Sequence, residues 1–372
     1  MKFMSRNKVF DLSASNSERI PILCFLLGSI GAAILMSINL SASEVSEEQI
    51  KITTFDQIEL AGTLTKPKNM KALFIPIHGS FVQTRDGDLD GSKQWMFPDG
   101  VPKRKLFIDI SNALINEQIG SFRYDKRASG ESGGSYPDTD LITLARDASE
   151  ALKAMRDRFP GIPIGFIAQS EGCLVVLREY FLGEKPDFIV FQGPPLENFV
   201  QQFEYQKRNA AAKFLDDVDG ILARRLPYLT AFYHALFYGD LLDKLKNTND
   251  DYYTLRLGHW SYTTSLRKYR QYDMNGYEML KDVASPVLVL IGEKDGNVSP
   301  EPVRRIISEK RNGLFSNVEA RILPDLEHSF REIGPGETFV EAMAKPLSQI
   351  YIKAITEYFN EMNTTCESEL SI

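Results

Sequence analysis

A serine flanked by small residues lies directly between an apolar run of strand length and an apolar helical run. The segment reads Ala168-Gln169-Ser170-Glu171-Gly172. A strand-to-helix turn this tight needs small residues on both sides of the serine, because larger side chains would collide with the neighbouring strand and helix. The turn would lift the hydroxyl of Ser170 out at the edge of a sheet, with Gly172 at the more crowded position. The pattern predicts a nucleophilic serine.

A serine nucleophile needs a base, and the chain has four histidines. In strand–turn–helix sites of this kind the serine comes first along the chain, then an acid, then the histidine. His78 therefore comes too early, and His234 and His259 lie in a long segment without a strand pattern. His328 follows the last predicted strand, so we expect it to take the proton of Ser170.

The acid that orients this histidine should follow a strand that lies between the serine and the histidine in the sequence. Asp295 follows the apolar run 287–291, and Glu293 and Asp325 are its rivals in nearby loops. A carboxylate here would fix the tautomer of His328 and stabilise its protonated form. We therefore expect Asp295 to complete a catalytic triad.

The negatively charged oxygen that forms during acyl transfer needs hydrogen-bond donors. The motif His78-Gly79-Ser80 follows an apolar run of strand length, and a turn there would point a backbone N–H at the substrate oxygen. The residue after the nucleophile supplies the second donor. The candidates are the N–H groups of Glu171 and of Ser80 or Phe81. We expect the side chain of His78 to hold this loop by hydrogen bonds.

Strands and helices alternate along most of the chain. Two runs with period-two alternation, 50–54 and 58–65, predict a hairpin. Six further runs are typical of strands buried in a sheet: 71–77, 119–124, 164–168, 188–192, 287–291 and 320–323. Apolar residues with helical spacing predict helices at 105–117, 141–155, 171–181 and 339–359. The alternation predicts an α/β fold with a mostly parallel sheet covered on both faces.

The alternation stops between residues 194 and 280, which show helical patterns and no convincing strand. This segment holds 16 of the chain's 40 aromatic residues. It predicts a helical cap inserted into a core that comprises residues 44–193 and 281–362. The aromatic residues either pack the cap's own small core or line a mostly apolar substrate pocket.

Residues 1–43 are typical of an export signal. The run 20–38 carries no charge, basic residues dominate before it, and small residues follow it. The run is long for a cleaved signal and reaches the roughly 18 residues that can span a membrane, so both a cleaved signal and an uncleaved anchor remain open. In both cases we expect the rest of the chain to be periplasmic, extracellular or anchored facing outwards, with membrane contact through this segment only.

Composition limits the partners. The chain has 372 residues and a formal net charge of −7, which argues against nucleic acid as a main partner. No segment matches a phosphate-binding loop, a dinucleotide fingerprint or the spacing of metal ligands, so we expect neither a cofactor nor a metal. Two charged segments, 85–87 and 123–132, are interpreted as loops that fix the surroundings of the site.

Together these segments resemble the α/β-hydrolase family, and more narrowly bacterial serine esterases. In those proteins the oxyanion loop reads roughly H-G-S-G-x-x-x-R-D-G, and R-Y-D-K-R-G-x-G-x-S and H-S-E-G follow. The corresponding segments here are 78–87, 123–132 and 169–172. Three positions depart from the pattern: Phe81 and Ala128 replace glycines, and Gln169 replaces a histidine. The resemblance runs from about residue 50 to 360 and implies ester hydrolysis through an acyl-enzyme on the serine.

The expected function is therefore hydrolysis of a small-molecule carboxylic ester. A serine aminopeptidase with the same triad is an alternative, because the family groups with such enzymes. It would need an acidic site in the cap for a substrate amine, which Asp216, Asp217 and Asp219 could supply. A non-catalytic binding protein on the same fold is a second alternative, although all three residues of the triad are present.

Overall fold

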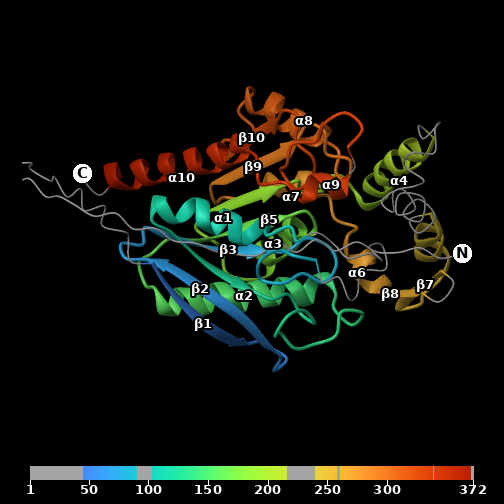
Figure 1. Cartoon of the computed structure of the whole chain (residues 1–372), viewed down its shortest axis with the longest axis horizontal. Coiled ribbons are helices and arrows are strands. Elements are labelled where there is room, and N and C mark those ends of the chain that lie inside the picture. Colours follow the sequence, from blue (N-terminus) through green and yellow to red (C-terminus); the bar gives the residue numbers. More distant parts are fainter. Residues whose placement is uncertain (1–44, 90–102, 216–238, 258–259, 338, 370–372) are drawn as a thin grey trace, which may run out of the picture. The chain divides into compact units, whose positions relative to one another are not determined.

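The computed structural model describes residues 45–89, 103–215, 239–257, 260–337 and 339–369 (Figure 1). The predicted export signal lies outside the described residues, and so do His234, His259 and the acidic group at 216–219. None of the helices in the described ranges is long and apolar enough to cross a membrane.

An eight-stranded sheet is the centre of the fold. In spatial order its strands are β1 (Val45–Thr53), β2 (Glu59–Pro67), β4 (Ile119–Tyr124), β3 (Ala72–Ile77), β5 (Ile164–Gln169), β6 (Ile189–Gln192), β9 (Val287–Gly292) and β10 (Val318–Leu323). The hairpin β1–β2 is antiparallel, and β2 is antiparallel to β4. All the other neighbours in the sheet are parallel. The predicted mostly parallel sheet with an antiparallel N-terminal hairpin is confirmed.

Helices cover both faces of this sheet (Figure 1). One face packs against α1 (Leu106–Leu114) and α10 (Gln349–Glu369), and the other against α2 (Leu141–Arg158), α3 (Glu171–Leu182) and α8 (Glu301–Lys310). Successive residues of β3 therefore point into different cores: Leu73 and Ile75 into one, Ala72 and Phe74 into the other. This explains why the strand is apolar at every position.

The ends of the helices follow local signals in the sequence. The carboxylate of Asp140 caps α2 by accepting a hydrogen bond from the N–H of Thr143 at 2.9 Å. The prediction of a single helix over 339–359 is wrong. Two helices, α9 (Phe339–Met343) and α10, stand there instead, with Pro346 between them. Proline has no N–H to donate and blocks a continuous helix.

The segment between β6 and β9 is a mixed insertion. It contains α4 (Phe199–Leu215), α6 (Leu266–Gln271), α7 (Gly276–Leu280) and the strands β7 (Tyr252–Leu257) and β8 (Trp260–Ser265). The prediction that it holds no strand is wrong, because β7 and β8 form an antiparallel hairpin. These strands are rich in threonine and tyrosine, which favour strands, and the buried Tyr253 and Thr264 are directly paired.

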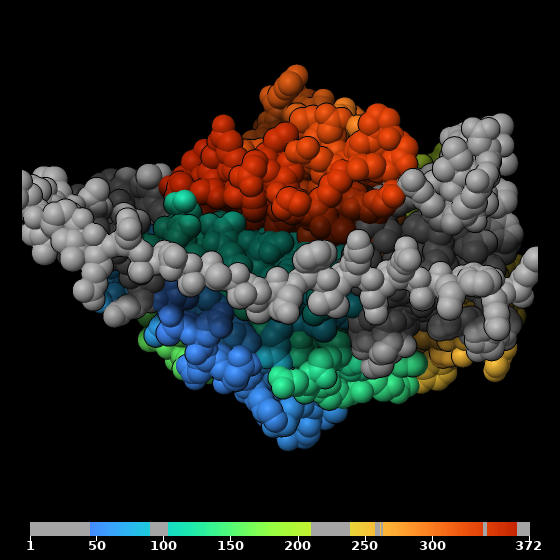
Figure 2. Space-filling model, viewed as in Figure 1, coloured from blue at the N-terminus to red at the C-terminus, as the bar shows by residue number. Residues whose placement is uncertain are grey.

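The sheet, its covering helices and this insertion form one compact unit. On the face shown in Figure 2 the surface is shared by segments far apart in the sequence. The blue surface belongs to the hairpin β1–β2, and the red and orange surface to the last part of the described chain.

Candidate active site

Ser170 lies in the turn between β5 and α3 with a strained backbone. Its φ is 55° and its ψ is −121°, a region that residues other than glycine rarely adopt. Strain of this kind costs roughly 1–3 kcal/mol and persists only where the surroundings enforce it. Here the N–H of Ser170 donates to the carbonyl of Gln192 at 2.9 Å, and the carbonyl of Ser170 accepts from the N–H of Cys173 at 2.9 Å.

Two glycines allow the chain to pass close to this turn. A methyl group added at Gly172 would clash with the backbone carbonyl oxygens of Ile77 and His78. One added at Gly79 would come within 3.2 Å of Cβ of Ser170. The strand-to-helix turn at Ser170, called the elbow below, thus packs directly against the end of β3. This explains why both segments need small residues.

Asp295 and His328 form a hydrogen-bonded pair. Oδ2 of Asp295 is 2.7 Å from Nδ1 of His328, and both residues are buried. The other carboxylate oxygen, Oδ1, accepts from the N–H groups of Asn297 and Val298, each at 2.8 Å. The rival Asp325 is exposed and pairs with a surface lysine. Glu293, the other rival, is exposed as well.

This pairing raises the pKa of the histidine. Burial alone would lower the pKa of His328, but the charge of Asp295 and its hydrogen bond outweigh burial and raise the pKa. Because the folded-state pKa is raised, the pair stabilises the fold most below the ordinary histidine pKa of 6.5. That contribution is lost as the pH rises through the folded-state pKa.

Gly193 joins the elbow to the acid–histidine pair. It follows β6 with a φ of 56°. A methyl group added to it would come within 3.0 Å of Cε1 and Nδ1 of His328 and 3.2 Å of Oδ2 of Asp295. The preceding residue, Gln192, supplies the carbonyl that holds Ser170. Gly193 is not predicted from the sequence, where its only signal is a position directly after a buried strand.

Helix α4 of the insertion holds the loop that carries the acid. The hydroxyl of Tyr205 donates to the carbonyl of Asp295 at 2.7 Å. Asn209 donates to the carbonyl of Gly296 at 2.9 Å, and Gln206 donates to that of Asn297 at 3.0 Å. Three successive carbonyls therefore accept from one helix, which fixes the acid loop against the insertion.

The loop after β3 is held by the histidine that begins it. Nε2 of His78 donates to the carbonyl of Thr84 at 3.2 Å, and the ring packs edge-on against Phe107 and Tyr124. Burial, reinforced by the charge of Lys126, lowers the pKa of His78 to about 3. The ring is therefore neutral near pH 7 and acts as a fixed donor to its own loop.

Two backbone N–H groups of this loop, those of Ser80 and Phe81, could donate to a substrate oxygen, and their surroundings differ. Phe81 has a φ of 69°, a conformation that glycine adopts more readily than other residues. Its N–H donates to the hydroxyl of Tyr136 at 3.0 Å. Phe81 could therefore serve a substrate oxygen only by sharing or giving up this bond. Ser80 lines the same pocket as Ser170.

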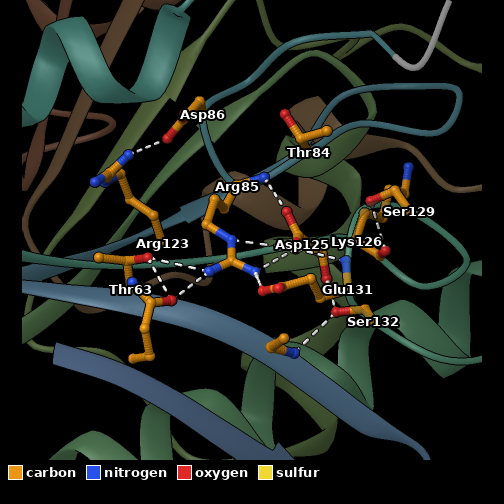
Figure 3. Close-up of polar contacts among 12 residues, drawn as sticks. Thr63, Thr84, Arg85, Asp86, Arg123, Asp125, Lys126, Ser129, Glu131 and Ser132 are labelled. Atoms are coloured by element: carbon orange, nitrogen blue, oxygen red, sulfur yellow. Dashed lines mark hydrogen bonds and ion pairs between the residues drawn. The ribbon is translucent and has the colours of Figure 1, made fainter.

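The charged segments fix the loops behind the site (Figure 3). The backbone N–H of Arg85 donates to Asp125 at 2.6 Å, and its guanidinium contacts both Asp125 and Glu131. Ser132 ties the same loop to β2: its hydroxyl donates to the carbonyl of Asp125 and accepts from the N–H of Ala61. Segments 85–87 and 123–132 are thus joined to each other by hydrogen bonds and ion pairs.

Glu171, the residue after the nucleophile, carries a buried carboxylate. Its Oε1 is 2.8 Å from Nζ of Lys126, its Oε2 is 3.1 Å from Nζ of Lys268, and the hydroxyl of Tyr272 donates to it as well. Burial would raise the pKa of Glu171, but the two lysines outweigh burial and hold the pKa far below its usual range. Lys268 is not predicted from the sequence, because no motif or apolar pattern around it marks a buried lysine.

A pocket opens over Ser170 between the sheet and the insertion. The core side contributes Ser80, Phe81, Ser170, Glu171 and Leu174. The segment from 195 onward contributes Pro195, Glu197, Phe199, Gln202, Phe203, Gln206, Tyr269, Tyr272 and Val298. Four of these aromatic rings, those of Phe199, Phe203, Tyr269 and Tyr272, also pack on one another. These aromatic residues of the insertion thus pack against one another and also line the pocket that contains Ser170.

Comparisons with known proteins identify the fold. No family model matches the chain, and no curated protein matches it. An esterase of Pyrococcus furiosus is 18% identical, with 86% of this chain and 94% of the esterase covered and a TM-score of 0.50. Est1E of Butyrivibrio proteoclasticus, with ferulic acid bound, is 15% identical, with 84% and 98% covered and a TM-score of 0.50. The chain has the α/β-hydrolase fold.

Replacing the acid should change the titration of the histidine. In Asp295→Asn the pKa of His328 should fall below its wild-type value, because the charge that raises it is gone while burial remains. An NMR titration that follows the imidazole resonances measures this directly. Asp325→Asn, which removes an exposed carboxylate, should leave the titration unchanged. Equal effects of the two substitutions would contradict the pairing.

Proposed function

We propose that the protein hydrolyses small-molecule carboxylic esters through an acyl-enzyme on Ser170. The observation that carries the proposal is the contact of Gly193 with the Asp295–His328 pair, because Gln192 beside it holds the Ser170 elbow. The segment 192–193 thus contacts Ser170 on one side and lies beside the Asp295–His328 pair on the other, which supports the assignment of these three residues as a triad. Ser170 also lines a pocket that it shares with Ser80 and Glu171.

The reaction follows from the roles of these groups. Ser170 attacks the ester carbonyl while His328 takes the hydroxyl proton, and His328 then returns that proton to the leaving alcohol. Water attacks the acyl-enzyme with His328 again as base, and Ser170 is released with its proton. Asp295 stabilises the imidazolium that forms in both halves.

The oxyanion donors proposed are the N–H groups of Glu171 and Ser80. Of the two candidates on the loop after β3, Ser80 is favoured because the N–H of Phe81 already donates to Tyr136. Removing a single donor of this kind typically costs roughly 10²- to 10³-fold in kcat. The ester carbonyl oxygen would therefore point toward the end of β3.

The pocket suggests an ester with an apolar or aromatic acyl group. Its walls include the rings of Phe199, Phe203, Tyr269 and Tyr272, and apolar surface of this kind favours apolar ligands. The bound ferulic acid of Est1E, which has the same fold, is an aromatic acid. A panel of alkyl and cinnamoyl esters tests this preference.

A peptidase is the second candidate function. Glu197 lines the pocket and offers a carboxylate to a substrate amine. Aminoacyl anilides therefore belong in the same panel. Faster hydrolysis of these anilides than of the esters would favour the peptidase.

We also propose that the protein is exported by residues 1–43, as a cleaved or anchored chain. The uncharged run 20–38 behind a basic segment supports this.

The nucleophile can be tested by substitution and by labelling. Ser170→Ala should lower kcat by roughly 10⁴- to 10⁶-fold and leave the fold intact, because only the hydroxyl is lost. A fluorophosphonate probe followed by peptide mass spectrometry should label Ser170 in the wild type and nothing in the variant. Label on another serine, or full activity of the variant, would refute the assignment.

The pocket walls should control the preference for the acyl chain. Each added methylene should gain up to about 0.8 kcal/mol, or roughly fourfold in kcat/KM, until the pocket is full. Phe199→Ala should move the optimum to longer chains and change kcat on a short ester by less than about tenfold. The control is Phe181→Ala, on the exposed end of α3, which should leave the optimum in place. If the preferred acyl-chain length is unchanged in both variants, Phe199 does not line the acyl site.

Export is tested on the protein recovered from its native cell. Mass spectrometry of the extracytoplasmic fraction should find a new N-terminus near Ser43 or Glu44, or else an intact membrane-bound chain. Recovery of the whole chain as soluble cytoplasmic protein would contradict both forms of the proposal.

A further inference from the structure

Lys268 is a buried cation that the insertion contributes to the core. It lies on α6, and its side chain is 2% exposed. Nζ is 3.1 Å from Oε2 of Glu171 and 3.0 Å from the hydroxyl oxygen of Tyr136. The ammonium also lies over the ring of Tyr136, 4.8 Å from its centroid.

The need to neutralise the charge of Glu171 does not by itself explain why Lys268 is buried. Lys126 already pairs with the Glu171 carboxylate at 2.8 Å and comes from the core. Burying a second ammonium carries a large desolvation penalty that its contacts must offset. Lys126 also donates to the carbonyl of Gly79 at 2.7 Å, whereas Lys268 donates to the hydroxyl of Tyr136, which in turn holds the N–H of Phe81.

The contacts of the Lys268 ammonium with Glu171 and Tyr136 lead to the two segments that carry the oxyanion donors. Glu171 is itself one donor residue, through its backbone N–H. The hydroxyl of Tyr136 accepts the N–H of Phe81 at 3.0 Å, and Phe81 is joined to Ser80, the other donor residue. Phe81 has a φ of 69°, so its backbone needs an external contact to hold it there. Lys268 thus bridges the elbow and the loop after β3.

We propose that Lys268, acting through Glu171 and Tyr136, is a positioning residue that sets the spacing of the two oxyanion donors. This rests on the proposed ester hydrolysis and adds a role for the insertion, which then supports the reaction as well as walling the pocket. Donors spaced for the tetrahedral intermediate act mainly in the transition state. Loss of Lys268 should therefore slow turnover and leave ground-state binding unchanged.

The test compares Lys268→Met, Lys268→Arg and Tyr136→Phe with the wild type. The matched control is Lys281→Met, because Lys281 pairs with Glu278 on the surface of the insertion. Three quantities are measured for each folded variant: kcat, KM and the dissociation constant of phenylboronic acid. The boronic acid forms a tetrahedral, negatively charged adduct with a nucleophilic serine, so it reports on the oxyanion site.

Lys268→Met should lower kcat by about 10- to 100-fold. This loss should not exceed the loss in kcat that removing one oxyanion donor causes. The dissociation constant of the boronic acid should rise by a similar factor, while KM stays within about threefold. Tyr136→Phe should show the same pattern more weakly, and Lys268→Arg should recover part of the loss. Lys281→Met should match the wild type.

A folded Lys268→Met variant with wild-type kcat and wild-type boronic acid affinity overturns the proposal, and so does a rise in KM alone. If Lys268→Met does not fold, Tyr136→Phe decides, since it removes one hydroxyl only. A wild-type chain that neither hydrolyses esters nor binds the boronic acid refutes the proposed function and this inference with it. An active wild type beside an unaffected variant refutes this inference alone.

Discussion

Parallel strands must end at the same edge of a sheet, and this constraint assembles the site. His78 follows β3, Ser170 follows β5, Gly193 follows β6 and Asp295 follows β9. These strands are neighbours in the sheet, so residues about a hundred positions apart, such as Gly193 and Asp295, come close together at one edge. The side-chain chemistry then depends on how closely the connecting turns can approach one another. The glycines at 79, 172 and 193 make that approach possible.

The parts that could be predicted are those with a short-range or periodic signal. The sheet was predictable because strands covered on both faces are apolar at every position, as β3 is. The elbow at Ser170 was predictable because its strain demands small neighbours. The pairing of Asp295 with His328 followed from the order of residues along the chain.

The remaining parts depend on contacts across the fold. The hairpin β7–β8 is built from short runs whose strand character is overridden by the helical patterns around it. Lys268 looks like a surface lysine in the sequence, and only the packing of α6 against the elbow buries it. Gly193 gains its meaning from His328, which lies 135 positions further along the chain. None of these contacts leaves a local pattern to detect.

The hydrogen bonds from α4 to the loop that carries Asp295 limit how this chain can be engineered. Helix α4 supplies the groups that hold the carbonyls of Asp295, Gly296 and Asn297. An insertion of this kind is not an exchangeable module, because replacing it with a short linker would take away part of the scaffold of the acid. Transplanting a foreign lid onto this core would require matching donors at the positions of Tyr205, Gln206 and Asn209. Recombination between distant members of the fold is therefore constrained by the contact between α4 and the loop 295–297, as well as by the two points where the insertion joins the core.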